Sequence, residues 1–260
     1  MRIAMGVEYD GRDFHGWQLQ PGVRTVQDCL EGAVARVADH PIRLHCAGRT
    51  DTGVHALGQV VHFDTQARRR SRSWVLGCNV NLPDDLSVTW AREVDEAFHA
   101  RFSAVARHYH YQILNRATRP ALARRQVTWV HDNLDLEPMR QAAVHLVGTH
   151  DFSSYRALGC QAKSPVRTLH YLQLARDGQR ISIRVGANGF LHHMVRNIAG
   201  VLIAIGRGDH SPGWAKEVLE YRDRTQGGIT APPDGLALTQ VDYPPEWQLP
   251  TAGPDLGWID

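Results

Sequence analysis

The sequence predicts an α+β fold in two parts. Segments with the apolar spacing of helices and segments with strand-like alternation occur in both halves of the chain. Their order lacks the regular strand–helix–strand alternation of a parallel sheet. With 260 residues and a hydrophobic fraction of 43%, the chain has the size of one or two globular domains.

The first half begins with a predicted strand over 3–9 and a turn-rich loop over 10–16. Thr25 is a predicted helix N-cap, with Asp28 three residues later as its capping-box partner. The apolar positions that follow at helical spacing are Val26, Leu30, Ala33, Val34 and Val37. The remaining predicted elements are strands over 42–46 and 59–63, a helix over 74–81 that ends at Pro83, and a strand over 86–94.

A second unit is expected to begin near Ala106, which divides the chain into domains over 1–105 and 106–260. Asp135 is the predicted cap of a helix that carries Met139, Ala143, Leu146 and Val147. The Asp177-Gly178 pair predicts a hairpin turn. The other predicted elements are strands over 109–114, 167–175, 179–185 and 236–241, an apolar helix over 191–205, a helix that begins at Ser211-Pro212, and an irregular tail after Tyr243.

The composition favours a soluble cytosolic protein. The start of the chain lacks the pattern of a signal peptide. The longest apolar run, 198–205, is far shorter than the ~20 residues that span a bilayer. The four cysteines form no Cys-x-x-Cys pair, which argues against structural zinc and a disulfide framework: Cys29, Cys46, Cys78 and Cys160.

The basic residues are almost all arginine. Only Lys163 and Lys216 interrupt this pattern among the 29 basic residues. The arginine guanidinium suits phosphates, base edges and aromatic rings, although a GC-rich genome also favours arginine codons. The run Arg68-Arg69-Arg70-Ser71-Arg72 is a sharper basic patch. We expect it to be a solvated face that is able to contact RNA phosphates.

Residues 46–56 read CAGRTDTGVHA, with Asp51 at the centre. Gly48 and Gly53 bracket a short charged stretch, and glycine allows a loop to fold tightly and to approach a ligand. A carboxylate held beside Arg49 is therefore a candidate reactive group. The same residues also fit a structural turn in which Thr50 and Asp51 bond to nearby backbone groups.

The chain resembles the tRNA pseudouridine synthase A family over almost its whole length. The loop around Asp51 is similar to the catalytic loop of that family. Further matching segments follow in the expected order: 9–11 with 16–18, 79–83, 98–104, 107–111, 151–152, 192–197, 235–236 and 241–244. Two positions depart from the family pattern, because Thr52 stands where Ala is usual and Phe14 where Tyr is more common.

The resemblance implies two related α/β domains with mostly antiparallel sheets, the pseudouridine synthase fold, with the active site in a cleft between them. It also implies conversion of uridine to pseudouridine in the anticodon stem-loop of tRNA, at positions 38, 39 and 40. The partners implied are tRNA and a second copy of the chain, because family members are homodimers. The isomerisation requires no redox change, so no cofactor and no metal are expected.

Within this resemblance Asp51 is the catalytic carboxylate, acting as a nucleophile or as a base. Burial opposes its ionisation, and a nearby cation offsets that cost. Arg196 is the implied pairing cation, although a purely structural ion pair is an alternative for this residue. Arg49 is implied to contact the displaced base or the RNA backbone.

Tyr109 matches the active-site tyrosine of the family, where its ring would stack on the extruded uracil and its hydroxyl would help to remove the C5 proton. Core packing is the alternative, because half of the side chains of an alternating strand pack in the core. Tyr111 lies on the same strand face, so the family motif, and not the strand pattern, selects Tyr109. Leu236 is implied to pack on the other side of the uracil. His55, His192 and His193 match no metal-binding spacing. We expect His55 to shape the loop, and His192 and His193 to pack or to contact RNA.

Three other functions fit parts of the sequence. One is a pseudouridine synthase that acts on another RNA site. A second is a non-catalytic tRNA-binding protein, which would not need Asp51. A third is a metal-dependent nuclease using Asp51 and His55, but such a site needs clustered carboxylates, and the loop has no second acidic residue.

Overall fold

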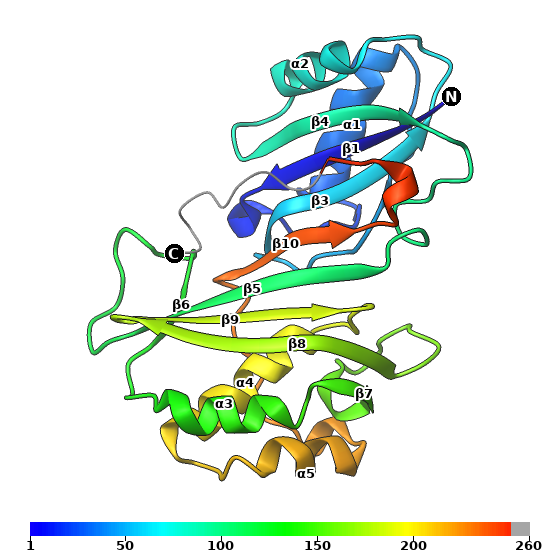
Figure 1. Cartoon of the computed structure of the whole chain (residues 1–260). Helices are drawn as coiled ribbons and strands as arrows, with labels where there is room; N and C mark the ends of the chain where they lie inside the picture. Colours follow the sequence, from blue (N-terminus) through cyan, green and yellow to red (C-terminus); the bar gives the residue numbers. More distant parts are fainter. Residues whose placement is uncertain (251–260) are drawn as a thin grey trace. The chain divides into compact units, whose positions relative to one another are not determined.

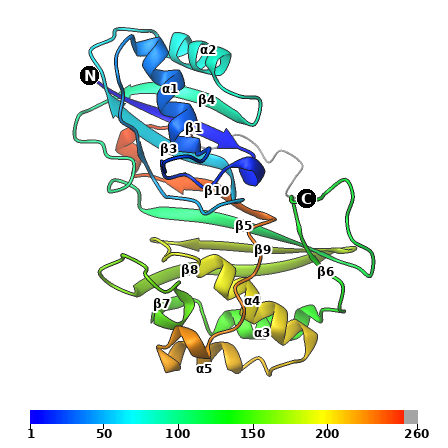
Figure 2. The same ribbon diagram turned by 180° about the vertical axis from the view of Figure 1, so that it is seen from behind.

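The computed structural model describes residues 1–250 (Figures 1 and 2). This part of the chain forms two compact units. The first contains residues 1–107 together with the described residues from Ala237 onward, and the second contains His108–Leu236. Strands and helices occur in both, so the predicted α+β class is confirmed.

The first unit is built on a sheet with the strand order β4-β1-β3-β10. The central strand β1 is antiparallel to both β3 and β4, whereas β10 joins β3 in parallel. A two-residue strand, β2, also pairs with β3. The bounds are β1 (Arg2–Tyr9), η1 (Gly11–Asp13), α1 (Val26–Ala38), β2 (His45–Cys46), β3 (His55–Asp64), α2 (Ser71–Asn81), β4 (Leu86–Val94), β10 (Leu236–Asp242) and η4 (Pro245–Trp247).

Helices α1 and α2 lie side by side on one face of this sheet (Figures 1 and 2). Thr25 is the N-cap of α1, as expected, since its hydroxyl oxygen accepts a hydrogen bond from the Asp28 amide at 3.4 Å. Gly77 lets α2 approach α1 closely, because a Cβ at this position would lie 2.9 Å from the Val37 side chain. Burial of Leu30, Val34 and Trp74 then anchors both helices.

One apolar cluster of the first unit includes residues near the end of the described chain. Its buried members are Ala4, Ala47, Val60, Phe98 and Ala100. Tyr243 and Trp247 pack against it, and the Tyr243 hydroxyl donates a hydrogen bond to the carbonyl of Ala100 at 2.6 Å. The segment after β10 is therefore ordered over 245–247 as η4, where the sequence predicted an irregular tail. The rest of the predicted tail, 251–260, lies outside the described residues.

The second unit has the strand order β5-β9-β8-β7, and β6 pairs with β5 in parallel. β8 and β9 form the predicted antiparallel hairpin, closed by the pair Asp177–Arg180. Helix α3 packs against β8 and α4, and α5 packs against both of those helices. The bounds are β5 (Ala106–Asn115), β6 (Thr128–Val130), α3 (Leu136–Val144), β7 (Gly148–Asp151), η2 (Ser153–Tyr155), β8 (Val166–Asp177), β9 (Arg180–Ala187), α4 (Met194–Arg207), α5 (Trp214–Tyr221) and η3 (Arg224–Gln226).

Several predicted elements differ from the structure at their ends. The strand expected over 42–46 is reduced to His45–Cys46, because its buried residues Ile42 and Leu44 pack without a strand partner. β3 begins at His55, four residues earlier than predicted. The helix expected to begin at Ser211-Pro212 starts at Trp214, after a turn closed by the Trp214 amide and the Ser211 carbonyl.

Helices α3 and α4 also differ from their predicted spans. α3 ends at Val144, so Leu146 and Val147 lie beyond it, although Leu146 is fully buried. α4 begins at Met194 rather than 191, because His193 before it has left-handed backbone angles, with φ 61°. The apolar pattern in the sequence indicates which residues are buried. Buried residues continue past the end of a helix, so the pattern overestimates the length of the helix.

Within residues 1–250 the chain changes unit twice. The first change falls between Arg107 and His108, close to the expected boundary at 105/106. The second falls at Leu236–Ala237, where the chain returns to the first unit and β10 pairs with β3. The sequence predicted one domain over all of 106–260, without this return. Ala237 pairs with His55, 182 residues earlier, and such a distant pairing leaves no local sequence pattern. None of the helices within residues 1–250 combines the length and apolarity of a membrane span.

Candidate functional site

The loop that carries Asp51 connects β2 to β3 in the first unit. It lacks regular secondary structure, so its backbone groups find partners elsewhere. The Ala47 amide donates to the carbonyl of Val60 at 2.8 Å, and the Trp17 amide donates to the carbonyl of Thr50 at 3.0 Å. The Val54 amide closes a turn onto the carbonyl of Asp51 at 3.1 Å. The loop is therefore bonded on both sides of Asp51.

Two glycines allow this loop to lie against the segment after β1. Gly53 has φ +81°, in the left-handed region, and its amide donates to the carbonyl of Phe14. Gly16 also has φ +81°, and a Cβ there would lie 2.8 Å from the carbonyl oxygen of Thr50. Residues with a side chain rarely adopt such angles, so glycine is favoured at both positions. The segment 11–17 thus forms one wall of the Asp51 loop.

Side chains complete the fixing of the loop. The carboxamide of Gln59 bonds to both backbone groups of Gly48, and the hydroxyls of Tyr9 and Thr50 lie 2.8 Å apart. Asp51 itself is half-buried, and Arg49 is exposed. The sequence predicted a tight loop around a carboxylate, and the loop is tight. The sequence did not indicate that Gln59, a fully buried polar residue of β3, holds the loop through Gly48.

His55 is the first residue of β3 and is buried. Its Nδ1 accepts a hydrogen bond from the Gly11 amide at 3.1 Å and lies 3.1 Å from a carboxylate oxygen of Asp10. These contacts connect the end of the Asp51 loop with η1. They match the loop-shaping part expected for His55.

The second unit carries three of the candidate residues on regular elements or at their ends. Tyr109 lies on β5 and is buried, with its ring edge-on to Phe190 at 5.0 Å between centroids. Leu236 is the first residue of β10 and is also buried. Arg196 lies in the first turn of α4 and is half-buried. Tyr109 and Leu236 are thus buried, whereas Arg196 is partly accessible.

Arg196 is bonded to the segment that follows η3. Its Nε donates to the carbonyl of Ala231 at 2.8 Å, and the Ala231 amide donates to the carbonyl of Arg196 at 3.1 Å. This reciprocal pair holds both the backbone and the guanidinium plane of Arg196.

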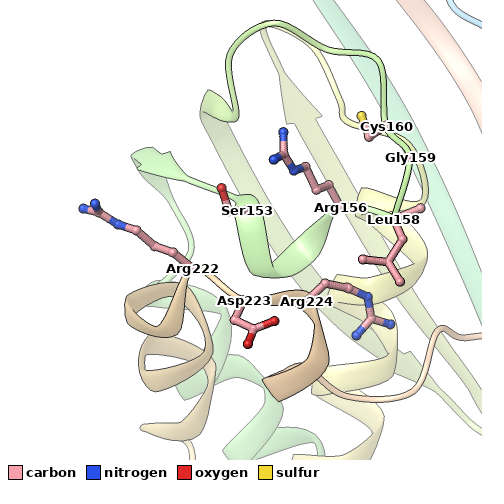
Figure 3. Close-up of a pocket in the computed structure, with 9 residues that line it drawn as sticks. Ser153, Arg156, Leu158, Gly159, Cys160, Arg222, Asp223 and Arg224 are labelled. Carbon is pink, nitrogen blue, oxygen red and sulfur yellow. The ribbon is translucent and has the colours of Figure 1, made fainter.

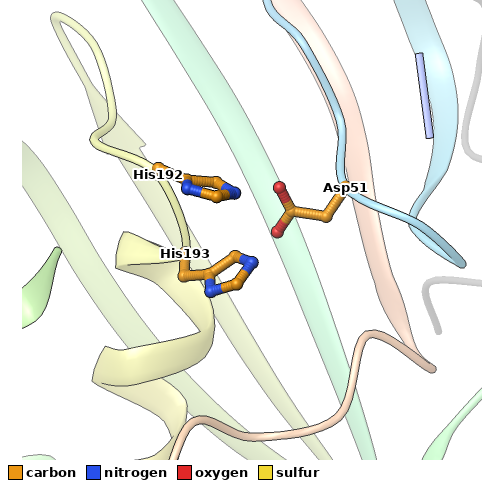
Figure 4. Close-up of side chains that lie close together, drawn as sticks. All are labelled: Asp51, His192 and His193. Carbon is orange, nitrogen blue, oxygen red and sulfur yellow. The ribbon is translucent and has the colours of Figure 1, made fainter. Parts of the chain in front are cut away.

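His192 and His193 precede α4, and their rings lie 4.0 Å apart between centroids. The carbonyl of His193 accepts the first hydrogen bond of the helix, from the Asn197 amide at 2.9 Å. His192 is exposed and His193 half-buried. Figure 4 shows both rings on the segment before α4, and the carboxylate of Asp51 on the loop before β3.

A pocket of about 280 Å³ lies in the second unit, and its lining includes none of the candidate residues. Figure 3 shows that the guanidinium groups of Arg156, Arg222 and Arg224 point in different directions from it. Arg224 is committed to structure, since it donates to Asn197 and Thr230 at 3.1 and 2.8 Å. Asp223 adds a carboxylate to the same lining. The arrangement offers no converging set of charges for an anion.

Comparison with known proteins identifies the family. Residues 5–103 and 142–244 match the family model described as tRNA pseudouridine synthase. The chain belongs to the tRNA pseudouridine synthase family. The expected family and the expected isomerase class are therefore confirmed, because pseudouridine synthases are isomerases.

Proteins named tRNA pseudouridine synthase A are similar to this family member over nearly their full lengths. The one from Nitrosococcus oceani is 59% identical, covering 96% of this chain and 96% of that protein. Those from Methylococcus capsulatus and Pseudomonas aeruginosa are each 57% identical, covering 96% of this chain and 92% and 88% of the relatives. The sequence comparisons alone support the family assignment.

Among solved structures, the archaeal box H/ACA sRNP Nop10-Cbf5 complex gives a TM-score of 0.37 at 12% identity, covering 86% of this chain and 59% of that chain. This similarity is distant. The segments matched by the family model include Asp51, Arg49, Arg196 and Leu236, whereas Tyr109 lies between them.

Proposed function

We propose that this chain converts uridine to pseudouridine at positions 38, 39 and 40 of the anticodon stem-loop of tRNA, with Asp51 as the catalytic carboxylate. The observation that carries the proposal is the placement of Asp51. It is held half-buried at the centre of a loop that is bonded on both sides, within a segment that matches the family model. Such a loop presents one carboxylate in a fixed orientation.

The reaction breaks the N1–C1′ bond, turns the uracil, joins C5 to C1′ and releases the C5 proton. N1 takes up a proton in place of the one that C5 loses, so the product is an isomer of uridine and the step needs no oxidant or reductant. A carboxylate beside the sugar serves this sequence either as a nucleophile or as a base. We assign that part to Asp51 and leave the choice between the two routes to experiment.

The uridine must leave its stack before it reaches a protein carboxylate, which costs a few kcal/mol. We propose that four residues bind the extruded nucleotide and offset this cost. Tyr109 provides an aromatic ring, a type of contact worth about 1–3 kcal/mol per base. Leu236 provides an apolar contact to the base. Arg196 and Arg49 provide guanidinium groups for the RNA, the first held by Ala231 and the second exposed on the Asp51 loop.

The setting follows from the same proposal. A tRNA substrate places the protein in the cytoplasm, and the family resemblance implies that it works as a homodimer. The four cysteines of the chain are free in the structure, which suits a reducing compartment: Cys29, Cys46, Cys78 and Cys160. Size-exclusion chromatography with light scattering tests the homodimer directly.

The test is tritium release from tRNA transcripts labelled at uridine C5. We expect release by the wild type, and at least a 10³-fold slower rate, as an order-of-magnitude value, for Asp51→Ala, because the reacting group is removed. Asp84→Ala is the matched control, since Asp84 is an exposed aspartate of the same unit outside the loop. It should react at the wild-type rate.

Transcripts in which uridines 38, 39 and 40 are replaced one at a time by cytidine then locate the modified positions. Loss of one equivalent of tritium per replaced uridine supports the proposed site. Unchanged release from a transcript that lacks all three uridines points to a synthase of another RNA site. No release by the wild type, together with tight tRNA binding, points to a non-catalytic tRNA-binding protein.

A further inference from the structure

The carboxamide of Gln59 is a buried polar group with a specific partner. Gln59 lies in β3 and is 0% exposed. Its Nε2 donates to the carbonyl of Gly48 at 2.6 Å, and its Oε1 accepts from the Gly48 amide at 3.4 Å. Burial of an amide costs free energy unless it is hydrogen-bonded. We therefore expect the Gln59 side chain to be ordered, and its two hydrogen bonds hold the backbone of Gly48 in place.

A second buried pair holds the loop two residues further on. The hydroxyls of Tyr9 and Thr50 lie 2.8 Å apart, and both residues are buried. Burial raises the pKa of the Tyr9 phenol far above its usual value, and hydrogen bonds with Thr50 and Gln59 lower it only in part. The phenol therefore stays protonated and remains available as a hydrogen-bond donor. Tyr9 thus connects the Thr50 side with the Gln59 side of the loop.

Together these contacts fix the residues on either side of Arg49 and directly before Asp51. Gly48 is held through its backbone, and Thr50 is held through its hydroxyl and also through its carbonyl, which accepts from Trp17. Asp51 directly follows Thr50, so these bonds lie one residue before the carboxylate. A displacement of about 1 Å at a reacting group can cost about 10²-fold in rate.

We infer that Gln59, Tyr9 and Thr50 are positioning residues that fix the Asp51 carboxylate for the isomerisation. The inference rests on the proposed function of Asp51 and adds three residues that act through it. None of the three needs to contact RNA for this role. Their removal should therefore lower kcat and leave KM for tRNA close to its wild-type value.

The chain offers a matched control for Gln59. Asn79, in α2, makes the same pair of carboxamide bonds to a single backbone residue, because it bonds to both the amide and the carbonyl of Val88 at 2.8 and 3.0 Å. This clamp joins α2 to β4 and does not touch the Asp51 loop. Gln59→Met and Asn79→Leu each delete one clamp and keep a side chain of similar size.

We expect Gln59→Met to lower kcat at least about tenfold, with KM within about twofold of the wild type. Asn79→Leu should lower the melting temperature by a comparable amount and keep the wild-type kcat. Amide hydrogen exchange over 47–54 should become faster in Gln59→Met and stay unchanged in Asn79→Leu. A Gln59→Met enzyme with the wild-type kcat would overturn the inference, as would equal kcat losses in the two variants.

Thr50 allows a rescue within one position. Thr50→Val keeps the shape of the side chain and deletes the hydroxyl, whereas Thr50→Ser keeps the hydroxyl. We expect kcat to fall about tenfold in Thr50→Val and to recover in Thr50→Ser. Equal kcat values for the two variants would show that the hydroxyl does not position Asp51.

Failure of this inference is separable from failure of the proposed function. If the wild type releases no tritium from any tRNA, the proposed function fails, while hydrogen exchange over 47–54 still tests whether Gln59 orders the loop. If the wild type is active, Asp51→Ala is inactive and Gln59→Met has the wild-type kcat, the proposed function stands and the positioning inference fails.

Discussion

The Asp51 loop and the start of α4 hold their candidate site residues in different ways. The loop has irregular backbone, and its conformation depends on side chains and backbone groups that reach it from β1, β3 and the segment 11–17. α4 supplies its own backbone bonds from Asn197 onward, so Arg196 depends mainly on how the helix packs. Asn197 is a buried polar residue of this helix, and its Nδ2 donates to the carbonyl of Tyr155 at 2.8 Å.

This contrast indicates which property single substitutions should change in each region. Loss of one hydrogen bond in the loop leaves the neighbouring backbone without a regular structure to fall back on. Loss of one side chain on the helix leaves the helical ladder intact. We therefore expect substitutions around the loop to change the rate of the chemical step, and substitutions around α4 to change stability and tRNA binding.

Among the substitutions around the loop, Gly16→Ala should have the largest effect on the reaction rate. A methyl group there would lie 2.8 Å from the carbonyl oxygen of Thr50, and the positive φ adds about 1–2 kcal/mol of strain. Thr50 must shift, and Asp51 with it. We expect tritium release to fall by about 10²-fold, as measured beside a thermal melt that reports the loss of stability.

Gly22→Ala is the control for the strain alone. Gly22 has φ +77°, but a Cβ at this position would meet no heavy atom within 4 Å. The variant should lose a similar strain energy and keep the wild-type kcat. If both variants lose kcat equally, the contact between Gly16 and Thr50 does not position Asp51.

Gly200→Ala makes the corresponding change on the helix side. A Cβ on this residue of α4 would lie 1.8 Å from the carbonyl oxygen of Ile229, two residues before the Ala231 partner of Arg196. The segment 229–231 must move, which should cost about 1–3 kcal/mol of unfolding free energy and raise KM for tRNA more than it lowers kcat. Urea unfolding and steady-state kinetics measure the two effects.

Gly32→Ala is the matched helix substitution in α1, where a Cβ would meet no atom within 4 Å. It should stabilise the protein by about 0.5–1 kcal/mol, because alanine loses less backbone entropy than glycine in a helix. A Gly200→Ala protein as stable as Gly32→Ala would show that the contact with Ile229 yields without cost.

Much of the fold could be predicted where its causes are local. Thr25 and the apolar spacing after it mark α1, and Asp177-Gly178 marks the β8–β9 hairpin, because a cap or a turn depends on neighbouring residues. β10 could be predicted as a strand, but its parallel pairing with β3 depends on residues distant in sequence. The left-handed angles of His193, which delay the start of α4, also leave no apolar signal.

The residues of the candidate site also differ in how far the sequence predicts them. Asp51, Arg49, Tyr109, Arg196 and Leu236 were found through the family resemblance, since their types and spacing alone fit ordinary turns and core positions. Gln59 was overlooked because it stood at the edge of a predicted strand, where a polar residue is unremarkable. Its partner Gly48 lies 11 residues earlier, across the loop, and only the fold brings the two together.

Each unit contains a buried histidine, and we expect the two to differ slightly in how they lower the stability of the protein in acid. His62 lies on β3, the strand of Gln59, and its Nδ1 accepts from the Ala100 amide at 3.1 Å. Burial, His99, Arg2 and His45 together lower its pKa to about 3, against a small opposite effect of Asp64. In the second unit, burial and Arg184 lower the pKa of His110 to about 4. Both histidines are neutral in the folded protein at pH 7.

The sign of the effect follows from proton binding. As pH falls below about 6.5, the unfolded chain protonates each histidine and the folded chain does not, so stability falls by up to about 1.4 kcal/mol per pH unit for each residue. The loss from His110 stops near pH 4, and the loss from His62 continues to about pH 3. Urea midpoints at pH 7, 5, 4 and 3.5 should therefore fall less in His62→Gln and in His110→Gln than in the wild type. Below pH 4 only His62→Gln should still differ in slope, and parallel curves for all three proteins would show that neither histidine is kept neutral by the fold.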